Sequence, residues 1–169
     1  MKKTSYKNRG MELEKKIDIA NKMYSIGHGL KRTYVASVHK IPTNVQITKE
    51  LPGKVIGFKK KGELVDYVGT LLGGHAIAFD AKQTKGKSLP LSNLHDHQYE
   101  FLKTWYNLGA TTFLIVYFSE EDKYYRLPFK DLRNAWEGAQ NGGRKSIPLK
   151  DFEIELIYYN GILNYLEGL

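Results

Sequence analysis

The sequence predicts an α/β fold built around one mixed sheet, and three observations support this. Apolar residues recur at three- and four-residue steps between Met11 and Tyr24, which is the pattern of an amphipathic helix. Residues 111–118 (TTFLIVYF) form an unbroken β-branched and aromatic run, typical of a strand buried on both faces. Shorter stretches between them alternate apolar and polar residues, as half-buried strands do. Helices and strands in this order favour a central mixed sheet flanked by helices.

The chain is expected to begin with a basic arm followed by the amphipathic helix. Residues 1–7 are rich in basic and polar residues, so they indicate a flexible arm that either lies along a phosphate backbone or has no function. The helix is expected to end near Gly27 and Gly29. Glu14 lies at the border of its apolar face, where it is either a solvated first-turn residue or a side chain directed into an active site.

Two strands and a projecting hairpin are expected next. Residues 32–42 and 44–48 have strand patterns, and a proline between them breaks the ladder. Residues 49–63 hold a Pro-Gly turn, which suits a hairpin, followed by a lysine run. The lysines at 59–61 are explained either as ordinary solvated charge or as cations at the tip of a hairpin that probes DNA.

Residues 64–84 are the stretch around which the other elements are arranged, because they carry two acids and a lysine on neighbouring short strands. Residues 75–82 (HAIAFDAK) alternate with period two, so Asp80 and Lys82 share a face with small alanines. Asp66 lies beside them if the preceding strand pairs with this one through the intervening Gly-rich turn. One strand face is therefore expected to pack and the other to carry the site.

A magnesium site is the chemical interpretation of this stretch. Magnesium is held by one or two carboxylates together with water and phosphate oxygens. A lysine beside such a site can offset the charge that grows on a phosphate, or orient the attacking water. The alternative is that two acids and a lysine on strands form surface ion pairs worth about 0–1 kcal/mol. The spacing of these residues alone leaves both interpretations open.

A second helix is expected over residues 94–108, after a polar connection at 84–93. Asn93 and Asp96 are suited to capping its first turn. The histidines on either side of Asp96 stand two positions apart, and residues at that spacing do not share a helix face. A zinc site there is therefore not expected.

The remaining elements follow the buried strand. They are an edge strand, a short helix, a Gly-rich basic loop, a last strand and a terminal helical turn, at residues 123–128, 129–139, 141–146, 152–159 and 161–169. In the loop, Arg144 and Lys145 are free to meet phosphates.

Composition limits the class of protein and its partners. The 169 residues suit one domain with its own core. Lys and Arg number 26 against 18 Asp and Glu, so a net charge of +8 favours a polyanion such as nucleic acid, although a generically basic protein has the same balance. Without cysteine, disulfides and thiolate sites are excluded. No signal peptide or membrane-length apolar run is present, so we expect a soluble intracellular protein.

Catalytic motifs of several large classes are absent from the sequence. It contains no P-loop, no GxGxxG and no GxSxG. ATP hydrolysis, dinucleotide redox chemistry and α/β-hydrolase chemistry therefore have no support.

Several stretches resemble a known nuclease family. The acid, the D-x-K strand and the helix after it are similar to the PD-(D/E)xK core, and longer stretches resemble the RecU family of Holliday junction resolvases. Five segments match in the family's order: NRGMELE (8–14), VHKIPTNVQI (38–47), VDYVG (65–69), FDAKQTKGKSLPLSNLHDHQ (79–98) and NGGRKSI (141–147). The match weakens after Ile147, and nothing is carried over to the region beyond it.

The resemblance implies a restriction-endonuclease-like core in one nuclease domain spanning residues 1–169, with a projecting basic stalk hairpin at about residues 49–62. It implies a cytoplasmic, nucleoid-associated homodimer that cuts four-way DNA junctions symmetrically in recombination and repair, with one or two Mg²⁺ or Mn²⁺ ions per active site. Asp66 and Asp80 match the metal-binding acids, and the backbone carbonyl of Ala81 joins them. Lys82 matches the lysine of the motif.

Two further residues and a set of cations are also assigned by the resemblance. Glu14 matches the family's first-helix glutamate, which helps to hold a metal or its water, and Gln98 matches a glutamine near the site. The second acid is usually glutamate in this family, so Asp80 is one methylene shorter. The basic residues expected to contact DNA are Arg9, Lys40, Lys54, Lys59, Lys60, Lys61, Lys85, Arg144 and Lys145.

The expected reaction is in-line attack of an activated water on a phosphodiester, with Lys82 orienting the water or offsetting charge. Two alternatives remain open from the sequence. One is a related PD-(D/E)xK nuclease that acts on linear or branched DNA. The other is a junction-binding recombination protein without catalytic activity, against which the intact set of two acids and a lysine argues.

Overall fold

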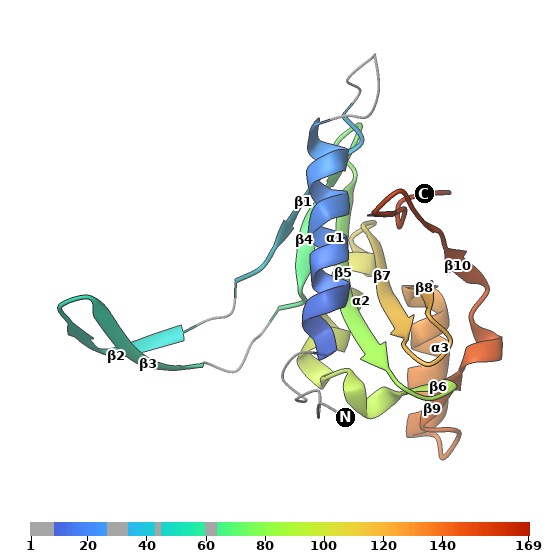
Figure 1. Ribbon diagram of the computed structural model, residues 1–169. Helices are drawn as coiled ribbons and strands as arrows, with labels where there is room; N and C mark the ends of the chain where they lie inside the picture. The colour runs from blue at the N-terminus through green and yellow to red at the C-terminus, as the bar shows by residue number, and fades with distance from the viewer. Residues whose placement is uncertain (1–8, 27–33, 43–44, 60–63) are drawn as a thin grey trace.

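A six-stranded mixed sheet forms the centre of the protein in the computed structural model, which describes residues 9–26, 34–42, 45–59 and 64–169 (Figure 1). The strands in spatial order are β1 (Ala36–Lys40), β4 (Tyr67–Leu71), β5 (Ala76–Thr84), β7 (Thr111–Phe118), β8 (Lys123–Pro128) and β10 (Ile154–Leu156). Strands β5 and β7 pair in parallel and the other neighbours are antiparallel.

Helices cover both faces of this sheet. Helix α1 (Arg9–Ile26) lies on one face, where it packs on β1 and β5 (Figure 1). Helices α2 (Asp96–Asn107) and α3 (Phe129–Gln140) contact β7 from the other face. The predicted fold class, a central mixed sheet flanked by helices, is confirmed. None of the helices in the described ranges is long and apolar enough to cross a membrane.

The two hydrophobic cores meet at β5 and β7, which are buried on both faces. Ile77 and Phe79 join the core beneath α1, whereas Ala78 joins the core beneath α2 and α3. The prediction for residues 111–118 is therefore confirmed. The face of β5 that was expected to carry the site also packs at Ala78, which is buried in the core beneath α2 and α3.

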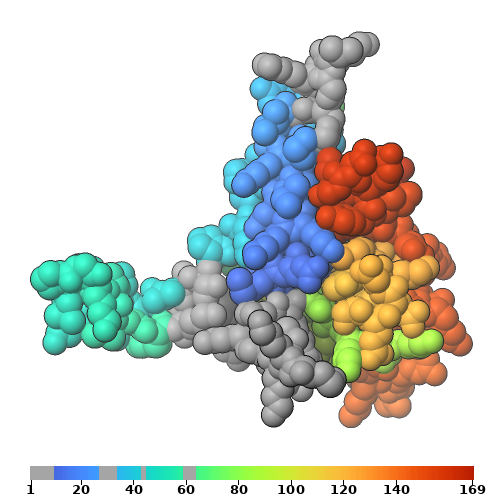
Figure 2. Space-filling view, viewed as in Figure 1, coloured from blue at the N-terminus to red at the C-terminus, as the bar shows by residue number. Residues whose placement is uncertain are grey.

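Strands β2 (Val45–Leu51) and β3 (Lys54–Lys59) form the predicted hairpin, which stands away from the body (Figures 1 and 2). Its tip is the Pro-Gly turn, where Gly53 adopts a φ of 70°. Lys59, the first lysine of the run at 59–61, is not at this tip. Lys59 pairs with Val45 at the opposite end of the hairpin, and residues 60–63 lie outside the described ranges.

Two other expectations from the sequence were wrong. Strand β8 is not an edge strand, because β10 pairs along its free side. The connection at 84–93 contains β6 (Ser88–Pro90), which pairs with β9 (Ser146–Pro148), and each of the two strands is followed by a short 3-10 turn, at Leu91–Asn93 and Leu149–Asp151.

The chain ends in a small hairpin rather than a helical turn. It is formed by β11 (Tyr158–Tyr159) and β12 (Ile162–Leu163), and Tyr165 then packs fully buried against Phe79, with ring centroids 5.0 Å apart. At the other end of the chain, α1 ends at Ile26, close to the predicted stop. The predicted arm at residues 1–7, Gly27 and Gly29 lie outside the described ranges.

Candidate active site

Asp66 and Asp80 lie side by side at the start of β4, where β5 extends beyond its pairing with β4. The pairing of β4 with β5 reaches only to Tyr67 and Phe79, so the next residues of β5 lack a strand on that side. Two bonds between side chains and backbone take the place of the ladder. The Asp66 N–H donates to Asp80 Oδ1 at 3.2 Å, and the Ala81 N–H donates to Asp66 Oδ2 at 3.1 Å. The two acids are therefore fixed side by side by the backbone that carries them.

Two neighbouring residues hold β4 in this position. Gly69 lies against β1, where a Cβ atom would stand 2.2 Å from the carbonyl oxygen of Ser37, so only glycine permits this approach. Tyr67 is fully buried and stacks on Phe79 with ring centroids 4.9 Å apart. Its hydroxyl donates to Asp18 Oδ1 at 3.1 Å, which ties β4 to α1.

Asp80 is the most buried acid of the site, and Lys82 and Gln98 surround it. Its side chain has no solvent exposure. Lys82 Nζ lies 2.6 Å from Asp80 Oδ2 and donates to Gln98 Oε1 at 2.9 Å. Gln98 Nε2 donates to Asp80 Oδ1 at 2.8 Å, which closes a ring of three side chains. Burial raises the pKa of the Asp80 carboxyl to about 7, with Lys82 opposing this change and the charge of Asp66 adding to it.

The first turn of α2 positions Gln98. His95 is the N-cap residue, and its side chain accepts from the Gln98 N–H while the Gln98 amide oxygen accepts from the His95 N–H at 3.1 Å. This is a capping box with glutamine as its third helical residue. Neither Asn93 nor Asp96 is the N-cap residue, although Asp96 lies in the first turn as expected. The His95 and His97 rings stack with centroids 5.4 Å apart, because His95 precedes the helix and the helical spacing rule does not apply to it.

The donor set around Asp66 and Asp80 fits a hard divalent cation. Asp66 Oδ1 accepts no hydrogen bond from the described residues, and the nearest polar partner of Asp80 Oδ2 is the Lys82 ammonium. The N–H and C=O groups of one strand residue point to the same edge, so the Ala81 carbonyl is directed toward Asp66. Within the described ranges, no three His, Asp or Glu side chains gather as ligands. Magnesium accepts such a site, because water and phosphate oxygens complete its shell.

Comparison with known proteins identifies the family. A sequence model of the family described as Recombination protein U matches residues 8–169. The chain belongs to the RecU family. It is 38% identical to the Holliday junction resolvase RecU of Pediococcus pentosaceus, over 97% of this chain and 84% of that protein. It is 36% identical to the Holliday junction resolvase RecU of Limosilactobacillus reuteri, over 97% of this chain and 82% of that protein.

A solved structure is also similar, though less closely. It is Hjc of Archaeoglobus fulgidus, a Holliday junction resolvase, with a TM-score of 0.43 and 13% identity over 72% of this chain and 73% of that one.

Glu14 lies near Asp66, since Lys40 is close to both carboxylates, but it is engaged by that cation. Its carboxylate pairs with Lys40 Nζ at 2.6 Å, and its backbone oxygen accepts from the Tyr67 hydroxyl at 3.3 Å. Partial burial disfavours the charged form of Lys40, but the hydrogen bond to Glu14 and the nearby acids raise its pKa overall. The sequence interpretation had assigned Lys40 to DNA and had missed Asp18, because a single acid on a helix gives no local signal.

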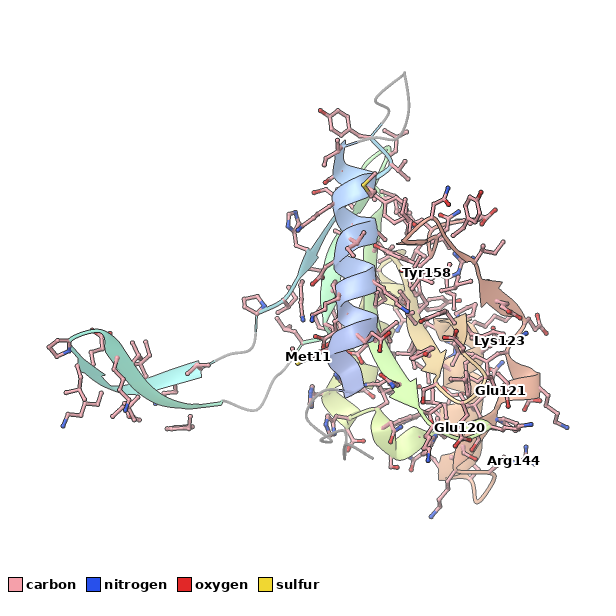
Figure 3. All side chains as sticks on the ribbon, in the orientation of Figure 1. Met11, Glu120, Glu121, Lys123, Arg144 and Tyr158 are labelled. Carbon is pink, nitrogen blue, oxygen red and sulfur yellow. The ribbon has the colours of Figure 1, made fainter. Side chains whose placement is uncertain are left out.

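The other residues expected to contact DNA are spread over several surfaces. Lys54 is exposed near the hairpin tip, and Lys85 is exposed in an ion pair with Glu120 at 3.6 Å. Arg144 and Lys145 are exposed on the loop before β9. Arg144 lies on the side of the body away from the hairpin (Figure 3). The backbones of Arg9 and Lys59 lie at the start of α1 and the end of β3, and Lys60 and Lys61 fall outside the described ranges.

Proposed function

We propose that this RecU family member is a metal-dependent endonuclease that resolves four-way DNA junctions by symmetric strand cleavage in recombination and repair. The observation that carries the proposal is the corner where Asp66 and Asp80 stand side by side with Lys82 and Gln98. The relatives named Holliday junction resolvase RecU support the choice of substrate.

The catalytic metal is proposed to be one or two Mg²⁺ or Mn²⁺ ions held by Asp66, Asp80 and the Ala81 carbonyl. When bound, such a cation supplies Lewis acidity that lowers the pKa of a water and neutralises charge on the scissile phosphate. Asp80 is pre-oriented for this task, because two donors fix its Oδ1. Its Oδ2 pairs with the Lys82 ammonium at 2.6 Å, so a bound cation would share or replace that contact.

Lys82 is proposed to offset the negative charge of the phosphate, and Gln98 is proposed to hold Lys82 in place for this. The ammonium is held within 3 Å of both Asp80 and Gln98, so it stands ready to donate to a phosphate oxygen or to the attacking water. Gln98 is itself fixed by the His95 N–H, and this limits the rotation of its amide. A donor that is already ordered costs little reorganisation during the reaction.

A homodimer is proposed because the hairpin exposes apolar side chains without any cover. Val45, Ile47, Leu51, Val55, Ile56 and Phe58 are between 41% and 59% exposed. Apolar surface of this kind marks an interaction site, and an isolated two-stranded hairpin is marginally stable in water. A second copy of the hairpin would cover these side chains. Two active sites related by a two-fold axis suit a nearly two-fold junction.

The hairpin is proposed to enter the centre of the junction, with Lys54 near its tip meeting phosphates. Specificity would then come from the shape of the junction rather than from base readout. Such a substrate would place the protein in the cytoplasm with the nucleoid.

Cleavage of a labelled four-way junction and of a linear duplex of the same sequence tests the proposal. We expect paired nicks near the junction centre that require Mg²⁺ or Mn²⁺, with the duplex left intact. Equal cleavage of both substrates would identify a general nuclease instead. Tight junction binding without cleavage in any divalent metal would identify a binding protein.

A further inference from the structure

A cavity of about 760 Å³ lies beside the candidate active site, between the start of α2, the end of α3 and the loop before β9. This volume is within the range of small-molecule sites, which is about 300–1,000 Å³. Its walls include Leu91 and Leu94, the α3 residue Trp136, and the loop residue Lys145. It brings together two segments that the catalytic corner does not use.

The loop that closes the cavity is fixed by backbone contacts. The Leu91 N–H donates to the Lys145 carbonyl at 3.0 Å, directly beside the pairing of β6 with β9. The Gly143 N–H donates to the Gly138 carbonyl at 2.9 Å, and a Cβ atom at residue 143 would stand 2.7 Å from that same oxygen. Only glycine fits there, so the loop folds tightly onto the end of α3. Lys145 is therefore held at the rim.

The chemistry of the walls suits a planar group that also carries an anion. Trp136 stacks on Tyr99 with centroids 4.6 Å apart and rings inclined by 10°, so its indole is held in one orientation. Leu91 adds an apolar wall, Lys145 supplies a cation, and Asp96 supplies hydrogen-bond acceptors. Aromatic stacking surfaces beside cations are how proteins bind unpaired nucleotides.

The cavity is coupled to the catalytic corner through one side chain. His95 lines the cavity, and its N–H donates to the Gln98 amide that also contacts Asp80 and Lys82. We propose that this cavity receives one unstacked nucleotide of the cut strand beside the scissile phosphate, with its base along Trp136 and its phosphate at Lys145. This proposal rests on the proposed function and adds a subsite to it.

The acceptor at the cavity wall gives the subsite a base preference. Cytosine, adenine and guanine each carry an exocyclic amino group that can donate to the Asp96 carboxylate, whereas thymine offers only its ring N3–H, which lies between two carbonyl oxygens that a carboxylate repels. The subsite therefore discriminates against thymine at the position that it holds. The bases around the centre of a four-way junction are suited to it, because unstacking costs least where pairing is already disturbed.

Junctions with single abasic residues test the subsite. Binding is measured in Ca²⁺, with one abasic residue placed in turn at each position around the cut. We expect one position at which the loss of the base weakens wild-type binding by about tenfold. The same abasic residue should have no further effect on the Trp136→Leu protein, whose folding is checked by circular dichroism.

Arg144→Ala is the matched control, because Arg144 is the neighbouring cation on the same loop but does not line the cavity. This variant should bind more weakly overall while keeping the full abasic penalty. The proposal is overturned if no abasic position weakens wild-type binding more than about twofold, or if Trp136→Leu and Arg144→Ala show the same penalty.

A second measurement separates failure of the subsite from failure of the proposed function. The chain has 2 tryptophans, so Trp105→Phe leaves Trp136 as the only indole. Titration of this protein with dCMP should change its fluorescence with an affinity at least about threefold higher than for TMP, and Lys145→Ala should abolish the response. This result would support the subsite even if junctions are not cleaved. Junction cleavage without any nucleotide response and without an abasic effect would overturn the subsite alone.

Discussion

The metal-free protein should become less stable as pH rises, because burial raises the pKa of Asp80 from 3.8 to about 7. The native state then keeps a proton that the unfolded chain has lost. The stability that this proton adds is fully present below the pKa of Asp80 in the unfolded chain, and it is lost as pH rises through the pKa of Asp80 in the folded protein. Stability falls by at most about 1.36 kcal/mol per pH unit in that interval, or about 4 kcal/mol in total.

The contribution of Asp80 is isolated by measuring urea unfolding in the presence of a chelator and comparing the wild type with Asp80→Asn. Other titrating groups cancel in the difference between the two proteins. Relative to the variant, the wild type should lose about 3 kcal/mol between about pH 5 and pH 8. Added Mg²⁺ should stabilise the wild type more at the higher pH, because the cation replaces the proton. If the two proteins show parallel pH profiles, the buried acid does not titrate as described.

Three further changes test the site, the sheet and the hairpin. Gln98→Met should lower the rate of junction cleavage at least about 100-fold. It should also lower the unfolding free energy by about 3 kcal/mol, because Asp80 and the His95 N–H each lose a hydrogen-bond partner. A loss under about 1 kcal/mol would contradict the role given to these hydrogen bonds. Gly69→Ala should destabilise the protein by about 2 kcal/mol, because the added methyl group would meet β1. Gly138→Ala in α3 has open space around it and should stabilise the protein by about 0.5–1 kcal/mol. Calorimetry measures both effects, and the reverse order of stability would contradict the packing described for Gly69. Phe58→Ser should shift the protein toward monomer in sedimentation, and a wild type that is already monomeric would refute the proposed dimer.

The sequence predicts those parts of the fold whose pattern is local. Residues 111–118 are recognisable because eight consecutive apolar or β-branched side chains leave few alternatives to a buried strand. The placement of Asp66 beside Asp80 follows from alternation and a Gly-rich turn, which together fix the register of β4 on β5. Gln98 could be assigned to the site only through the family resemblance, since no local sequence pattern indicates that its amide reaches β5.

The parts that could not be predicted depend on contacts between distant segments. Strands β6 and β9 have three residues each, which is too short for a periodic signal, and they pair across most of the second half of the chain. The apolar residues within 161–169 have helix-like spacing, so a helical turn was expected there. The burial of Tyr165 against Phe79 favours the hairpin of β11 and β12 instead. The cavity between α2 and α3 follows from the β6–β9 pairing and was missed with it.

Single-turnover cleavage of a four-way junction at saturating protein tests the catalytic corner most directly. Wild type, Asp66→Asn and Asp80→Asn are compared in Mg²⁺, and junction affinity is measured for each in Ca²⁺. We predict that both variants lose at least about 100-fold in rate. Their affinities should stay within about threefold of the wild type, because exposed cations supply the binding. Cleavage by Asp80→Asn at the wild-type rate would contradict the assignment of this corner as the active site.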